Sequence, residues 1–102
     1  MHVEIATDGV RIGDAGNLRA LDVRCEHGVD LAAALGSFGE VTDDGQHVWL
    51  LIDELRTRAG ASVAADELDD WRDGFDAMIT FARSKGWTSA DDRRVRAHVD
   101  TA

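Results

Sequence analysis

Residues 64–87, AADELDDWRDGFDAMITFARSKGW, decide the fold because they predict one long amphipathic helix. With side chains about 100° apart around the axis, one face collects apolar residues at the three-and-four spacing of a core-facing helix. These residues are Leu68, Trp71, Phe75, Met78, Ile79 and Ala82. Acidic residues fill the first half and Arg83 and Lys85 end the helix, the order that the helix dipole favours. Gly86 followed by Trp87 predicts the stop.

The apolar arc of this helix is wider than a single core contact requires. Gly74, Ala77 and Phe81 extend it to roughly 200°, about twice the arc of an ordinary surface helix. A glycine inside a helix costs about 1 kcal/mol relative to alanine, so a close approach by another backbone would explain Gly74. Two interpretations stay open: another segment of the same chain covers this side, or a second copy does. Gly74, Ala77 and Phe81 are therefore the candidate self-association residues.

The rest of the chain predicts short strands and short helices in one domain, residues 1–102. Apolar alternation on both sides of Asp8-Gly9 predicts an N-terminal antiparallel β meander. Further strands are expected over residues 18–25, 47–52 and 93–99, the last closing the fold. Short helices are expected over 30–35 and 53–59, capped by Asp30 and Asp53, with a loop over 36–45. The predicted class is α+β, with one long amphipathic C-terminal helix and a closing strand.

Composition excludes several partners. The 102 residues carry a net charge of −9, whereas phosphate binding needs concentrated Lys and Arg, so no nucleic-acid partner is expected. No apolar run approaches the ~20 residues of a membrane span, and the start does not resemble a signal peptide. A single cysteine fits a reducing compartment. The sequence therefore predicts a cytoplasmic protein without a membrane partner, and at this size a homodimer is the commonest way to bury an extra face.

Two strands bring titratable and aromatic residues to one side. His47 and Trp49 project from the same face of the strand at 47–52, and Arg96 and His98 do so on the closing strand. A pocket between them would combine an aromatic wall with titratable groups. The alternative is that Trp49 belongs to the core and His47 is a half-exposed strand end. These four residues are the candidate ligand-pocket residues.

Other chemistry has weaker support, and no metal or cofactor is expected. Cys25 and His27 have the spacing of a thiolate and base or of two metal ligands, but Cys25 also continues an inward apolar pattern. The acidic set Asp66, Asp70 and Asp73 fits a solvated helix face as well as a cation site. No hydrolase, nucleotide-binding or zinc-finger motif is present, so whether the protein is an enzyme stays open.

One resemblance concerns the C-terminal third. The stretch WRDGFDAM at 71–78, with Gly86-Trp87 and RAHV at 96–99, resembles small actinobacterial proteins to which no activity is attached. It implies a bacterial source and carries over no catalytic residue.

Two functional hypotheses follow from these patterns. The first is a small binding or accessory protein that self-associates through its long helix or binds a protein partner there. The second is a small enzyme or ligand carrier with a pocket near His47, Trp49 and His98.

Overall fold

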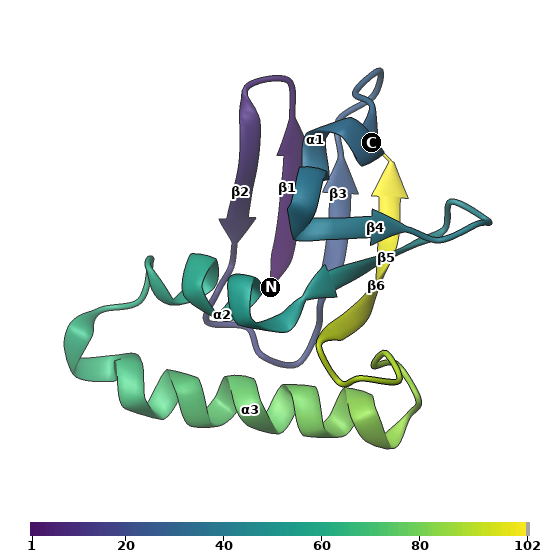
Figure 1. Cartoon of the computed structure of the whole chain (residues 1–102). Coiled ribbons are helices and arrows are strands. Elements are labelled where there is room, and N and C mark those ends of the chain that lie inside the picture. The colour runs from purple at the N-terminus through teal and green to yellow at the C-terminus, as the bar shows by residue number, and fades with distance from the viewer. Residues whose placement is uncertain (102) are drawn as a thin grey trace.

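The computed structural model describes residues 1–101, and this part of the chain forms a curled mixed sheet with helices packed against it (Figure 1). The strands are β1 (His2–Ala6), β2 (Gly9–Gly13), β3 (Asp22–Cys25), β4 (Gly39–Val41), β5 (His47–Leu51) and β6 (Arg94–Thr101). The helices are α1 (Leu31–Leu35), α2 (Ile52–Gly60) and α3 (Leu68–Ser84), with 3₁₀ turns η1 (Gly36–Phe38) and η2 (Ala65–Glu67). The predicted α+β class, with a long C-terminal helix and a closing strand, is confirmed.

The sheet order is β2-β1-β3-β6-β5-β4, and its third strand joins in parallel. β1 and β2 form the expected antiparallel hairpin, and β3 then lies on the other side of β1, parallel to it. This is possible because residues 14–21 loop around the start of β1. The α-amine of Met1 donates hydrogen bonds to the carbonyls of Asn17 (2.7 Å) and Ala20 (3.0 Å) in this loop. β6 completes the middle of the sheet, parallel to β3 and antiparallel to β5.

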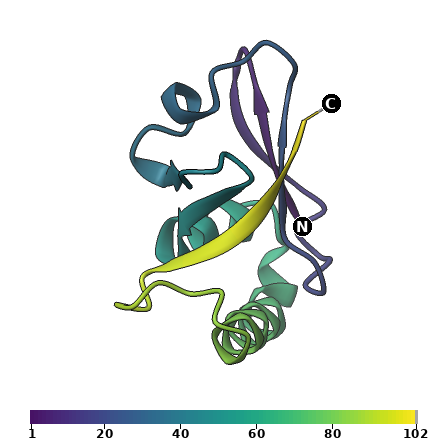
Figure 2. The ribbon, with the colours of Figure 1, turned by 90° about the vertical axis from the view of Figure 1, so that its right-hand side faces the viewer.

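Alternation along the strands separates a buried face of the sheet from an open face. In β5, Val48 and Leu50 are fully buried, whereas His47 and Trp49 are half-buried. Successive side chains of a strand point to opposite faces, so the two pairs lie on different sides. The core joins the buried face to residues of all three helices, including Leu35, Leu55 and Phe75. In Figure 2, α1 and α2 lie on one side of the sheet and α3, viewed along its axis, lies at the lower end, which leaves the other side without a helix among residues 1–101.

α3 follows the predicted helix closely. Its expected core positions are buried at Trp71, Phe75, Ile79 and Ala82. At its end Gly86 has a φ of 76°, the Gly86 N–H donates to the carbonyl of Arg83 (3.1 Å), and the Trp87 N–H donates to that of Ala82 (2.9 Å). This pair of bonds is the Schellman motif, so the predicted stop is confirmed. Within the described chain, no helix combines the length and apolar composition that a membrane span needs.

Three predicted boundaries are wrong. The strand expected over 18–25 begins only at Asp22, because residues 14–21 wrap around Met1. Asp53 is not a helix cap: α2 follows β5 directly with Leu51 as N-cap, and Asp53 lies in the first turn, where the helix dipole still favours its charge. The loop expected over 36–45 contains η1 and β4, and β4 pairs with β5. By contrast, Asp30 caps α1 as expected, since its carboxylate accepts a hydrogen bond from the Ala33 N–H.

Candidate functional site

The sheet register brings the four candidate pocket residues together on the open face. Across the β5–β6 pair, His47 lies opposite His98 and Trp49 lies opposite Arg96. The two imidazole rings meet edge to face, with centroids 5.5 Å apart. Trp49 does not belong to the core, because its neighbours along β5 are the inward-facing residues. Cross-strand neighbours are close enough to contact one bound molecule together.

A hollow of about 250 Å³, here called the Arg96 pocket, opens beside these residues. It is lined by Leu21, His47, Trp87, Arg96 and His98. Three of the four candidate residues therefore line it, but Trp49 does not, and Trp87 supplies the aromatic wall. The backbone of Trp87 lies beside β6, and the Trp87 carbonyl accepts a hydrogen bond from the Arg96 N–H at 2.7 Å. The sequence places Trp87 directly after Gly86, and this position predicts where the helix ends. It does not predict which strand Trp87 then lies beside.

The charged side chain that lines the Arg96 pocket is that of Arg96 itself. Two neighbouring arginines form ion pairs: Arg94, on the same strand, pairs with Glu40 at 2.8 Å, and Arg24, on β3, pairs with Asp22 at 3.3 Å. Arg96 is half-buried and forms no ion pair with any carboxylate of the described chain. A guanidinium in this position keeps its hydrogen-bond donors free for a bound molecule.

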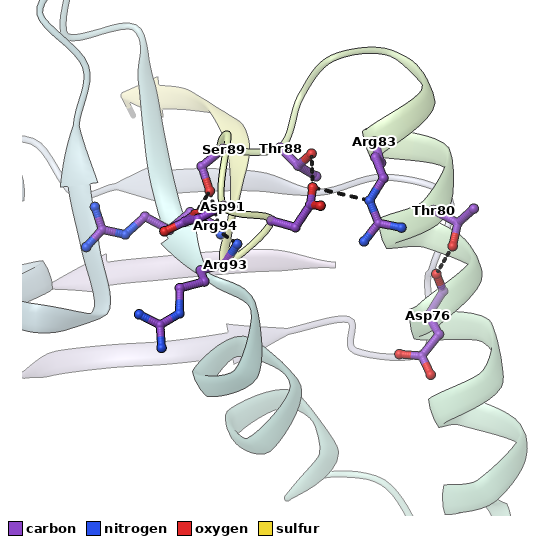
Figure 3. Close-up of polar contacts among 9 residues, drawn as sticks. Asp76, Thr80, Arg83, Thr88, Ser89, Asp91, Arg93 and Arg94 are labelled. Carbon is purple, nitrogen blue, oxygen red and sulfur yellow. Dashed lines mark hydrogen bonds and ion pairs between the residues drawn. The ribbon is translucent and has the colours of Figure 1, made fainter.

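The turn between α3 and β6 holds Trp87 beside the pocket. The Ser89 hydroxyl donates to the Asp91 carboxylate at 2.6 Å, a bond that Figure 3 shows inside the turn. Arg83, near the end of α3, pairs with Asp92 at 3.3 Å. Together these contacts stabilise the turn and tie it to the end of α3. The hydrogen bond from Ser89 and a second from a backbone N–H lower the pKa of Asp91.

A second surface lies on the C-terminal half of α3. Phe81 is 56 % exposed and Trp87 39 %, and they are the exposed large hydrophobic residues of the described chain. Their rings meet edge to face at 6.0 Å, and the Lys85 ammonium lies 5.6 Å from the Phe81 ring. Two further hollows, of about 260 and 340 Å³, continue from the Arg96 pocket past these rings. We call this surface the Phe81 face; it comprises Leu18, Arg19, Ala77, Met78, Phe81 and Trp87.

The candidate self-association residues differ in their surroundings. Gly74 is half-buried and partly covered within the chain, because a Cβ built on it would lie 2.5 Å from Cδ1 of Leu18. The expectation of a close backbone neighbour is thus corrected: the neighbour is a side chain of the 14–21 loop. Ala77 and Phe81, one and two turns further along α3, are exposed. The uncovered part of the wide apolar arc is therefore limited to the second half of the helix.

Cys25 and His27 do not form a joint site. Cys25 points into the core from β3 and is 4 % exposed, whereas His27 is exposed in the turn that follows. The thiol is within hydrogen-bonding distance of the carbonyls of Glu26 (3.6 Å) and Val29 (3.7 Å). Among residues 1–101, no three His, Cys, Asp or Glu side chains come together as metal ligands.

We expect the Cys25 thiol to react with a disulfide reagent more than about a hundredfold more slowly in the native protein than in urea, since reaction needs an opening of the central strand β3. Burial raises its pKa from the ordinary 9.0, so little thiolate forms. The folded state buries the neutral thiol, and the resulting contribution to the free energy of unfolding is fully present below pH 9.0. This contribution is lost as the pH rises through the raised pKa of Cys25. Stopped-flow thiol titration of the native protein and of the protein in urea measures the ratio of the two reaction rates. Equal rates would show that Cys25 is accessible.

Comparisons with known proteins add no relative. No family model, curated protein or solved structure matches the chain. The molecule is defined by its own features as an α+β domain with an open polar sheet face, the Arg96 pocket and the adjoining Phe81 face.

Proposed function

We propose that this protein is a small binding or accessory module that forms a homodimer through the Phe81 face. The observation that supports it is the exposure of Phe81, 56 %, in contact with exposed Trp87. Burying a phenylalanine side chain contributes about 1.5–3 kcal/mol, and a two-fold interface uses each residue twice. The single cysteine, Cys25, is free, which fits a reducing compartment such as the cytoplasm.

An antiparallel pairing of α3 with its copy fits this face in shape and charge. With the two-fold axis between Ala77 and Phe81, each Phe81 ring packs against the small Ala77 of the second copy. The same pairing brings Lys85 near Asp73 of the second copy. Both side chains are exposed, and neither forms an ion pair within the described chain. Because acids lie early in α3 and bases late, a parallel pairing would instead set like charges together.

Phe81→Asp is expected to raise the dimer dissociation constant at least about a hundredfold, because two buried aromatic rings are replaced by two charges that lose their hydration. Light scattering coupled to size exclusion, over a range of concentrations, measures it. The matched control is Ala32→Asp, which adds the same charge at an exposed position of α1, outside the Phe81 face. It should leave the dimer dissociation constant unchanged. A strictly monomeric wild type would contradict the homodimer and leave the face to a different protein partner.

The pair of Lys85 and Asp73 tests the antiparallel arrangement separately. Lys85→Asp and Asp73→Lys should each weaken the dimer, since each sets like charges together across the interface. The double variant restores opposite charges and should regain most of the wild-type affinity. Absence of this rescue, with a dimer that still depends on Phe81, would reject the antiparallel pairing but keep the Phe81 face as the interface.

A further inference from the structure

We propose that the Arg96 pocket binds a small organic anion that carries a flat ring, such as an aromatic carboxylate or an aryl phosphate. This inference goes beyond the self-association proposed above and does not depend on it, although Trp87 borders both surfaces. It rests on the charge of the pocket lining, on the Trp87 indole that lines the pocket and on the pocket volume.

The charge of the lining selects an anion. The chain holds 20 Asp and Glu against 11 Lys and Arg, yet the polar residues of the pocket are an arginine and two histidines. The Arg96 guanidinium offers a planar set of N–H donors that fits a carboxylate or phosphate. His47 and His98, in edge contact at 5.5 Å, add ring N–H donors. Arg96 is half-buried, so its attraction for an anion is screened less than that of a fully exposed arginine.

Two carboxylates lie near the pocket without lining it. Asp22 lies opposite His98 across the β3–β6 pair, and its carboxylate pairs with Arg24 at 3.3 Å. Asp100 lies two residues beyond His98, with 4.0 Å between its carboxylate and the imidazole. Neither aspartate lines the pocket. An anion at Arg96 therefore meets N–H donors without a carboxylate in the same hollow.

An aromatic residue of the lining selects a flat ring. Trp87 lies beside Arg96, whose backbone N–H donates to the Trp87 carbonyl, whereas Trp49, opposite Arg96 on β5, does not line the pocket. Trp87 is 39 % exposed and lines the pocket, so part of its indole is available to a ligand. An indole offers a large apolar surface to a planar group. The pocket, of about 250 Å³, has room for a single ring with its acidic group.

The test follows backbone and indole N–H signals by NMR while benzoate or phenyl phosphate is added. Saturable shifts are expected at Arg96, His98 and the Trp87 indole in the wild type and in Phe81→Asp. Arg96→Gln should weaken binding about ten- to hundredfold, the usual effect of removing a charge-assisted hydrogen bond. The matched control is Arg94→Gln, because Arg94 lies on the same strand and its guanidinium already pairs with Glu40. The affinity of this variant for the aromatic anion should stay within about twofold of that of the wild type.

Three ligand comparisons can overturn the proposal without any variant. Benzyl alcohol has the ring but no charge, and binding as tight as that of benzoate would show that no anion is selected. Inorganic phosphate has the charge but no ring, and binding as tight as that of phenyl phosphate would show that Trp87 takes no part. Absence of shifts with both aromatic anions at millimolar concentrations would reject the site. Saturable shifts with only one of the two aromatic anions, benzoate or phenyl phosphate, would identify the acidic group of the ligand as a carboxylate or a phosphate.

Discussion

Replacing Phe75 with alanine is expected to lower the free energy of unfolding by about 3–5 kcal/mol. The Phe75 ring has no solvent exposure and lies 5.3 Å from the Trp71 ring. On its other side the Arg56 guanidinium is 5.1 Å from the ring centroid, and Arg56 pairs with Asp76 at 2.9 Å. These neighbours are fixed on α2 and α3, so they cannot close the cavity that the smaller side chain leaves. The loss is a large part of the stability of about 5–15 kcal/mol that a domain of this size has.

Phe81→Ala is the matched control for Phe75→Ala, because it makes the same change on the same helix at an exposed position. Its cost should stay at about 1 kcal/mol, since it removes mainly the contact of Phe81 with the Trp87 ring, when unfolding by urea is followed at a concentration where the protein is monomeric. At concentrations where the dimer forms, its cost should grow, because folding and association are then linked. An equal cost for the two variants in the monomer would mean that α3 is rotated relative to the core.

Replacing Ala97 with aspartate is expected to prevent cooperative folding. Ala97 is 2 % exposed in β6 and lies opposite fully buried Val48, in the middle of the sheet. A carboxylate there would lose its hydration without gaining a partner, which costs several kcal/mol even after relaxation. Far-UV circular dichroism during heating should show no cooperative transition, or one lowered by tens of degrees.

His98→Asp is the control for Ala97→Asp, one residue further along the same strand. His98 is exposed on the open face, so this variant should melt within about ten degrees of the wild type, the loss coming from the like charges of Asp22, opposite it, and of Asp100. The contrast tests the register of β6, because a slip of one residue exchanges the two faces of a strand. If Ala97→Asp were as stable as His98→Asp, the β6 pairing described here would be wrong.

The sequence predicted the parts of the fold that local patterns record. Alternation at 93–99 correctly separated Arg96 and His98 from the inward residues, because side chains of a strand change face at every step. For the apolar run 47–52 the sequence left open whether Trp49 belongs to the core, and the structure places Trp49 half-buried on the same face as His47. The spacing along α3 correctly gave its buried face, and Gly86 gave its end. The Asp53 cap and the strand ends were misplaced, and β4 was missed in the expected 36–45 loop, since hydrogen-bond partners elsewhere in the fold decide where an element starts.

The tertiary structure decided which segments meet. No local pattern shows that β3 joins β1 in parallel, that Leu18 covers Gly74, or that Trp87 comes to lie beside Arg96. Each of these contacts joins residues far apart in the chain or across a turn. Periodicity reports that a side chain is buried or exposed, but it does not name the partner. The sequence by itself therefore determined the elements and their faces, whereas the Arg96 pocket and the extent of the Phe81 face arise from packing between distant segments.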